Sequence, residues 1–101
     1  MKILTVCSTG LGSSFMTQLN IEKALKNLGV DGVETDHKDL GSTNAGDADV
    51  VFVGRDIAEA ASGLGDVVVL NSLIDMNEIT QKVIGALERH GVEVPDKETA
   101  R

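Results

Sequence analysis

The sequence has almost no aromatic residues: it contains Phe15 and Phe52 but no tryptophan and no tyrosine among its 101 residues. The core must therefore be built from Val, Leu, Ile and Ala. The overall composition, 42% hydrophobic and 25% charged, is otherwise that of a soluble globular domain. The lack of aromatics also argues against flavin binding, because in an α/β fold the flavin ring is usually flanked by such side chains.

Basic residues are also scarce. Nine Lys and Arg against sixteen Asp and Glu give a net charge of −7, which argues against binding to nucleic acid or to an anionic membrane surface. No apolar run is long enough to span a membrane, and the run after Lys2 is too short for a signal peptide. A single cysteine excludes an internal disulfide and fits a reducing compartment. We therefore expect a cytoplasmic protein that does not insert into the membrane.

Short apolar segments alternate with helical patterns along the chain. Strands are expected at residues 2–6, 30–38, 49–53 and 66–70, with helices at about 13–28 and 75–90 and a short helix capped by Asp56. This alternation predicts a Rossmann-like α/β three-layer sandwich, a four-stranded parallel sheet in the order 2-1-3-4 with helices on both faces. Residues 1–91 are expected to form a single domain, and residues 92–101 a flexible C-terminal tail.

Several residues predict where the helices begin and end. Gly29 and Gly91 stand where a left-handed residue is expected to end each long helix. Asp75, followed three residues later by Glu78, resembles the capping box that begins a helix.

The only cysteine lies between the first apolar run and a polar, glycine-rich loop. Cys7 is followed by Ser8, Thr9, Gly10, Leu11, Gly12, Ser13 and Ser14. Such glycines let backbone N–H groups turn toward an anion, and the first turn of the next helix adds further donors. The same donors stabilise a thiolate, so the pattern predicts a phosphate-binding loop with Cys7 as nucleophile. The alternative is that Cys7 is a small buried core residue.

Other known loop chemistries fit poorly. Cysteine phosphatases carry Arg six positions after the cysteine, where this chain has Ser13. The dinucleotide fingerprint fails because Phe15 stands at its last glycine, and the chain has neither a Gly-Lys-Ser/Thr motif nor a Cys-x-x-Cys pair. His37 and His90 lack partners at metal-ligand spacing, so neither a metal nor another cofactor is expected.

Parallel strands also bring distant loops together. The Cys7 loop, the turn at Gly54 and Arg55, and the loop at Asn71 all follow strands and should share one edge of the sheet. In open parallel sheets ligands bind at this edge, near the point where the strand order reverses. The sequence therefore places its candidate site between the first and third strands.

Residues 6–16, VCSTGLGSSFM, resemble the active-site loop of the IIB components of the phosphoenolpyruvate-dependent sugar phosphotransferase system. The likeness is to the ascorbate-type group, which is related to the galactitol-type IIB proteins. Segments 20–25, 55–59 and 68–75 are similar to the same group, so the resemblance covers nearly the whole chain. Ser8 and Thr9 depart from it, because many members have Gly and Asn there.

The resemblance implies a phosphoryl relay. A phosphohistidine on a IIA protein would phosphorylate Cys7, with residues 8–14 as the phosphate cradle. The protein would then dock on the IIC membrane transporter, at the inner face of the membrane, and pass the group to a sugar held by IIC. An ascorbate-like sugar or a pentitol or hexitol is the substrate class implied. Arg55 is either an auxiliary group that reaches the phosphate or the partner, or a solvated cation in a turn.

Two other functions stay open at this point. One is a low-molecular-weight cysteine phosphatase or an arsenate reductase-like enzyme, against which the missing Arg at position 13 argues. The other is a non-catalytic module whose loop holds an anion without covalent chemistry. His37 is expected to be a strand or surface histidine.

Overall fold

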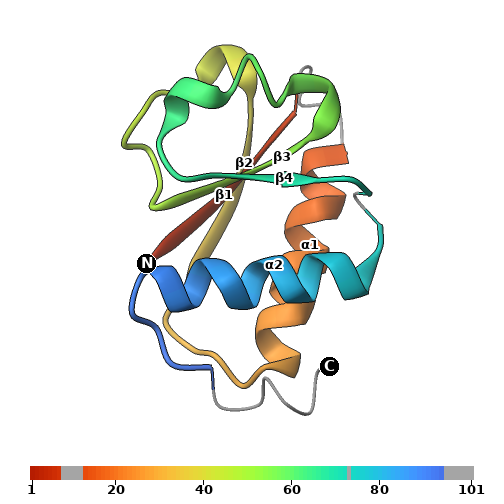
Figure 1. Ribbon diagram of the computed structural model, residues 1–101, viewed down its shortest axis with the longest axis vertical. Coiled ribbons are helices and arrows are strands. Elements are labelled where there is room, and N and C mark those ends of the chain that lie inside the picture. Colours follow the sequence, from red (N-terminus) through yellow and green to blue (C-terminus); the bar gives the residue numbers. More distant parts are fainter. Residues whose placement is uncertain (8–12, 73, 95–101) are drawn as a thin grey trace.

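The computed structural model describes residues 1–7, 13–72 and 74–94. Its strands and α-helices are β1 (Lys2–Cys7), α1 (Ser13–Asn27), β2 (Glu34–Asp39), β3 (Val50–Gly54), β4 (Val67–Leu70) and α2 (Met76–Arg89). Short 3-10 helices, η1 (Leu40–Ser42), η2 (Arg55–Ile57) and η3 (Ser62–Leu64), lie in the connections between strands. The four strands form one parallel sheet in the order β2-β1-β3-β4, which confirms the predicted fold class (Figure 1).

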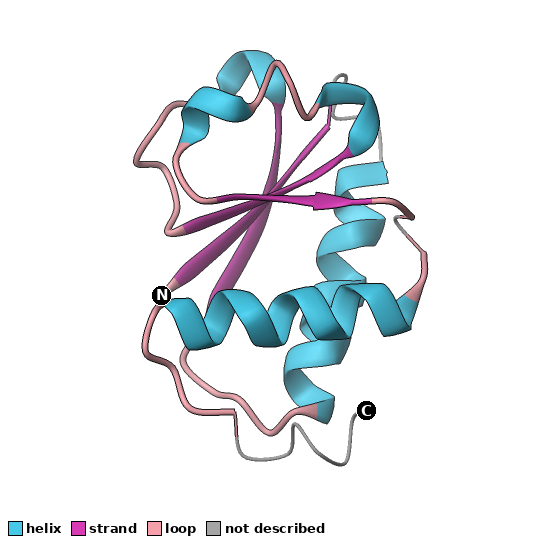
Figure 2. Cartoon of the chain, in the orientation of Figure 1, coloured by secondary structure: helices cyan, strands magenta, loops and turns pink. Residues whose placement is uncertain are grey.

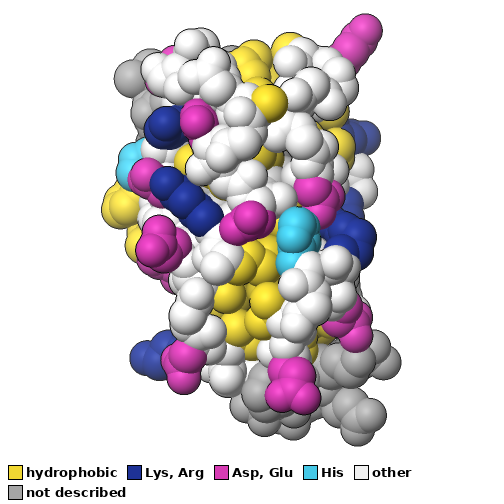
Figure 3. All heavy atoms as spheres, turned by 90° about the vertical axis from the view of Figure 1, so that its left-hand side faces the viewer, with side chains coloured by type: hydrophobic (Ala, Val, Ile, Leu, Met, Phe, Trp, Pro, Cys, Tyr) yellow, Lys and Arg dark blue, Asp and Glu magenta, His cyan; other side chains and the backbone are white. Residues whose placement is uncertain are grey.

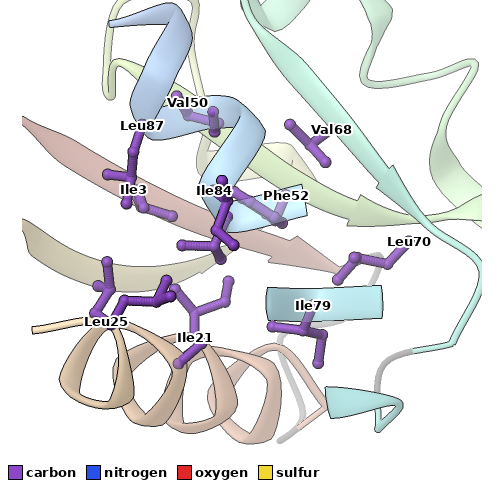
Figure 4. Packing of buried hydrophobic residues seen from close by; sticks show 14 residues of the cluster. Ile3, Ile21, Leu25, Val50, Phe52, Val68, Leu70, Ile79, Ile84 and Leu87 are labelled. Carbon is purple, nitrogen blue, oxygen red and sulfur yellow. The ribbon is translucent and has the colours of Figure 1, made fainter. Parts of the chain in front are cut away.

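Both α-helices pack on the same face of the sheet. Ile21 of α1 and Ile84 of α2 belong to one buried cluster with Phe52 of β3 (Figure 4). The cluster is aliphatic apart from Phe52, as the composition requires. It stabilises the fold, because burial of apolar surface is the dominant favourable contribution to folding.

The opposite face of the sheet is covered by 3-10 helices and loops (Figure 2). Leu4, Val6 and Val53 pack there against Ile57 and Ala61. Helices were predicted on both faces of the sheet. On this face they are short 3-10 helices and not α-helices. The twelve residues between β3 and β4 are too few to form a stable helix in addition to the turns they need.

The prediction that Asp56 caps a short helix is wrong. Asp56 lies inside η2, and the residue that precedes the helix is Gly54, which has no side chain to cap it. The second strand begins later than predicted, because Gly32 has φ 81° and bends the chain between α1 and β2. Residues 30–33 therefore belong to a loop.

Both α-helices end as the sequence predicts. Gly29 has φ 70°, and the N–H of Val30 donates to the carbonyl of Leu25 at 3.0 Å. Gly91 has φ 74°, and the N–H of Val92 donates to the carbonyl of Leu87 at 2.9 Å. This six-to-one bond across a left-handed glycine is the Schellman motif, so each helix ends at a fixed residue.

The segment after α2 continues along the core. Val92 and Val94 are partly buried against the cluster that contains both α-helices. Residues 95–101 of the predicted tail lie outside the described residues, so their flexibility stays a prediction. Figure 3 shows the side of the molecule toward which the N-terminus lies, where hydrophobic side chains remain visible between charged ones.

Candidate functional site

Cys7 is the last residue of β1, at the end of a central strand. Side chains alternate along a strand, and Ile3 packs on the α-helical face while Leu4 and Val6 pack on the other. Cys7 is four residues after Ile3 on the same strand, an even number, so its side chain is directed to the same face, which α1 and α2 cover. The residue is half-buried at this edge of the sheet.

The strand register brings the predicted loops to one edge. Cys7 pairs with Asp39, Val6 pairs with Val53, and Gly54 pairs with Leu70. All four strands therefore end along one line, with β1 and β3 side by side at its centre. The segments that follow Cys7, Gly54 and Leu70 leave the sheet at this edge, as the sequence predicted.

The predicted phosphate cradle is described only in part. Ser8, Thr9, Gly10, Leu11 and Gly12 lie outside the described residues. Ser13 and Ser14 form the first residues of α1, so a helix N-terminus follows the loop as expected. Unpaired N–H groups of a first turn, together with the positive end of the helix dipole, favour an anion at this position.

Arg55 begins η2 directly after β3, and its side chain is exposed. The residue therefore lies at the same edge as Cys7. Its contact with a phosphoryl group or with a partner protein stays a prediction.

Asp39 lies beside Cys7 in the sheet, which the sequence alone did not indicate. Its backbone is paired with that of Cys7, and the hydroxyl of Ser42 is the main cause that lowers the pKa of its carboxyl group. The backbone groups of Gly41 and Ser42 lower this pKa further. A carboxylate beside the thiol-bearing strand end adds negative charge, which the donors around a bound anion must outweigh. Only the register reveals Asp39, because the residue is 32 positions from Cys7 in the sequence.

The loop between β4 and α2 is held by carboxylates. Asp75 caps α2 and accepts hydrogen bonds from the N–H groups of Asn77 and Glu78, as predicted. Glu78, however, does not complete a capping box. Its carboxylate accepts from the N–H of Asn71 at 2.7 Å and of Ser72 at 2.8 Å.

The pKa of Glu78 is lowered to about 2, first by the N–H of Asn71 and next by the ammonium group of Lys82. The Nζ atom of Lys82 lies 2.9 Å from Oε2 of Glu78 and also donates to the carbonyl of Val69. This network ties the start of the Asn71 loop to α2 and fixes the loop next to the sheet edge.

The first turns of α1 carry apolar side chains in solvent. Phe15, Met16 and Leu19 are 45%, 54% and 41% exposed. The ring of Phe15 lies 5.1 Å from that of His37, centroid to centroid. His37 is on β2, so it is a strand histidine as predicted.

Within the described residues, no group of three or more His, Cys, Asp or Glu side chains is arranged to hold a metal ion. Across the same residues, none of the helices has the length and apolar character needed to cross a membrane.

Comparison with known proteins gives two kinds of match. Residues 2–85 match the family model described as "PTS system, Lactose/Cellobiose specific IIB subunit". No curated protein sequence matches. Among solved structures, the lactose-specific IIB component domain of the phosphoenolpyruvate:carbohydrate phosphotransferase system from Streptococcus pneumoniae is similar. Its TM-score is 0.54 at 19% identity, over 89% of this chain and 93% of that one.

A low-molecular-weight protein tyrosine phosphatase from Bacillus subtilis is similar to the same degree. Its TM-score is 0.53 at 14% identity, over the whole of both chains. At such identities the two structures share only the fold with this chain, and the fold does not separate carrier from phosphatase. The family model separates the two, because it describes a IIB subunit of the phosphotransferase system. The model is of the lactose/cellobiose type, so the expected ascorbate-type or galactitol-type subgroup is not supported.

Proposed function

This chain belongs to the lactose/cellobiose-specific IIB subunit family of the phosphotransferase system, and we propose that it carries a phosphoryl group on the Sγ atom of Cys7. IIB subunits are phosphotransferase components that work with IIA and IIC components. The observation that carries the proposal is the position of Cys7, which ends a central strand and points to the face covered by α1.

The proposed relay has two balanced steps. The thiolate of Cys7 attacks the phosphorus of a IIA phosphohistidine, an S–P bond forms, and the N–P bond breaks with its electron pair on the imidazole. A sugar hydroxyl bound at IIC then attacks the same phosphorus, its proton passes to solvent or to a base, and Cys7 leaves as thiolate. Such transfers pass through a loose transition state, so positioning and charge stabilisation provide most of the catalysis. Backbone donors at the start of α1 supply both.

Hydrolysis is the competing reaction, because a similar solved structure is a phosphatase. A phosphatase needs a cation on the equatorial oxygens while water attacks. This chain has Ser13 where cysteine phosphatases carry Arg, and Ser13 is the first residue of α1. The neutral side chain favours a carrier over a low-molecular-weight phosphatase or an arsenate reductase-like enzyme.

The second transfer would bring the protein to the inner face of the membrane through IIC. For the sugar, the resemblance of the Cys7 loop to ascorbate-type proteins implies an ascorbate-like sugar or a sugar alcohol, whereas the family model is of the lactose/cellobiose type. Membranes that contain a matching IIC protein and labelled ascorbate, galactitol or cellobiose distinguish these classes. The labelled sugar that becomes phosphorylated in the presence of this protein identifies the class.

The direct test is intact mass after incubation with phosphoenolpyruvate, the general phosphotransferase enzymes and a IIA protein. We expect the mass of one phosphoryl group on the wild-type chain and none on Cys7→Ser. Rapid loss of label as inorganic phosphate, or equal labelling of Cys7→Ser, would contradict the carrier function.

A further inference from the structure

Asp39 and Cys7 end two neighbouring strands. β2 lies next to β1 in the sheet, and Asp39, the last residue of β2, is paired with Cys7, the last residue of β1 (Figure 1). Paired residues of neighbouring parallel strands direct their side chains to the same face, and the strands lie about 4.8 Å apart. The carboxylate and the thiol therefore leave the sheet side by side.

Contacts of β2 with α1 identify this face independently. Gln18 of α1 donates to Oγ1 of Thr35 at 3.2 Å, and Nδ1 of His37 lies 2.6 Å from Oε1 of Gln18. Asp39 follows His37 by two residues on the same strand, so its side chain is directed to the same face. This is the face assigned to Cys7 from the packing of β1, so both strands place the two side chains under α1 and not on opposite sides of the sheet.

The turn after β2 keeps the Asp39 carboxylate at this edge. A Cβ atom at Gly41 would lie 3.2 Å from Oδ2 of Asp39, so the carboxylate lies against the start of η1. The hydroxyl of Ser42 is the main cause that lowers the pKa of Asp39, so the group is ionised at neutral pH. Oγ1 of Thr43 donates to the backbone carbonyl of Asp39 at 2.9 Å and fixes the end of the strand. A negative charge is therefore held beside Cys7.

The charge on Cys7 itself differs between its chemical states. The thiol is neutral, the thiolate carries one negative charge, and a phosphoryl group carries close to two at neutral pH. A neighbouring carboxylate disfavours each state in proportion to its negative charge. Two unit charges about 6 Å apart in water change a pKa by about half a unit, which is about threefold in the equilibrium constant. The same carboxylate should thus act more strongly on phosphocysteine than on the thiolate.

We propose that Asp39 is a positioning residue that acts through Cys7: its fixed negative charge disfavours the phosphorylated form and so increases the tendency of Cys7 to pass the group on. The inference deepens the proposed function and rests on it. A carrier that bound its phosphoryl group too tightly would accept it and not release it. The N–H groups at the start of α1 provide the attraction, and Asp39 limits it.

Other charged groups lie near the same edge. His37 is two residues before Asp39 on the same face, and Arg55 follows β3. The first turn of α1 contains no acidic residue. At the start of α2, the carboxylates of Asp75 and Glu78 accept hydrogen bonds from nearby backbone N–H groups. All of these groups stay the same when Asp39 is replaced, so the comparison of variants isolates the Asp39 charge.

The first test measures the thiol. Alkylation of Cys7, the only cysteine, by iodoacetamide is followed against pH in wild type, Asp39→Asn and Asp36→Asn. Asp36 is the matched control, because it pairs with Leu4, whose side chain packs on the opposite face. We expect the midpoint to fall by about half a unit in Asp39→Asn and to stay at the wild-type value in Asp36→Asn.

Asp39→Glu, which keeps the charge, should also keep the wild-type midpoint, and circular dichroism checks the fold of each variant. An unchanged or raised midpoint in Asp39→Asn overturns the inference, and so does an equal fall in Asp36→Asn.

Salt separates an effect of charge from an effect of structure. The Debye length falls from about 10 Å at 0.1 M salt to about 3 Å at 1 M. The difference in midpoint between wild type and Asp39→Asn should therefore nearly vanish at 1 M salt. A difference of the same size at both concentrations would come from altered structure at the end of the strand, and it overturns the electrostatic role.

The second test measures the transfer, at equilibrium with a phosphorylated IIA protein of the lactose/cellobiose type. Intact mass gives the phosphorylated fraction of this chain at a pH below the alkylation midpoint, where Cys7 is a neutral thiol. Phosphorylation then adds about two negative charges, so Asp39→Asn should raise the equilibrium constant about tenfold. Equal constants in wild type and Asp39→Asn overturn the inference. If wild type is not phosphorylated at all, the carrier function fails, and a lowered midpoint in Asp39→Asn then stands as an effect on the thiol alone.

Discussion

The carboxylate of Glu78 accepts a 2.7 Å hydrogen bond from the backbone N–H of Asn71, seven residues earlier. It accepts a second bond from Ser72 and pairs with Lys82. One side chain of α2 thus anchors the loop that follows β4 at the edge where Cys7 ends β1.

The first prediction concerns this anchor. Glu78→Gln removes the charge that strengthens the bonds from Asn71 and Ser72, so the loop should open more often. We expect faster amide hydrogen exchange at these two residues by about tenfold, with little change in the central strands. Glu59→Gln, at an exposed position, is the control. Unchanged exchange in Glu78→Gln would show that the loop is held by other contacts.

The second prediction is the pH dependence of stability due to the same carboxylate. Its pKa is lowered from 4.5 to about 2 in the folded protein. A carboxyl group with a lowered folded pKa stabilises the fold above its unfolded pKa, and this contribution is lost as pH falls through the folded value. Denaturant midpoints of wild type and Glu78→Gln should therefore differ by a constant amount above pH 5. The difference should shrink between about pH 4.5 and 2.

A third prediction tests a charged cluster at the other end of the molecule. Asp66 precedes β4, and Nη2 of Arg89 and Nε2 of His90 lie 3.0 and 2.9 Å from its carboxylate oxygens. Partial burial raises the pKa of Asp66, but the bonds from His90 and Arg89 outweigh it and the pKa is lowered. Asp66→Asn should reduce the free energy of unfolding by about 1 kcal/mol or less, since the groups are partly exposed.

Because this cluster lies at the beginning of β4, Asp66→Asn should be phosphorylated on Cys7 at the wild-type rate. Chemical denaturation and the intact-mass assay measure the two effects separately. A phosphorylation defect without a stability defect would contradict the assignment of the cluster to folding alone.

The fourth prediction addresses the lifetime of the phosphocysteine. Ser13→Arg places a bidentate cation where cysteine phosphatases have one, and should stabilise charge as water attacks. We expect the phosphoprotein to lose its label about tenfold faster, a small part of what a complete oxyanion site provides. A general acid for the leaving group is still missing, so full phosphatase turnover is not expected.

Ser14→Arg, one residue along α1, is the matched control, and circular dichroism checks the fold of both variants. Hydrolysis of p-nitrophenyl phosphate by the wild-type chain at an enzyme-like rate would replace the carrier function with the phosphatase one.

The sequence predicted those features that depend on local pattern. The runs that became β1 and β3 are continuous and apolar, and both strands are almost wholly buried at the centre of the sheet. Gly29 and Gly91 end the helices because no other residue adopts the left-handed conformation so readily. The same patterns brought Cys7 to the end of a central strand.

The features that the sequence missed depend on pairing across the chain. Asp39 stands beside Cys7 only because β2 pairs with β1 in one register. Glu78 had a local partner in Asp75, but the N–H groups of Asn71 and Ser72 compete for its carboxylate once β4 is in place. The covering of the second face by 3-10 helices follows from the short connection between β3 and β4, and not from any residue type.

The exposed ring of Phe15, set against His37, also makes the protein easy to observe. The chain contains no tryptophan and no tyrosine, so its intrinsic fluorescence is very weak. Phe15→Trp would place a single indole in the first turn of α1, after the Cys7 loop, with no emission from elsewhere in the molecule. A shift of that emission to shorter wavelength on addition of the IIA protein would report the arrival of the partner directly, in real time and without a label.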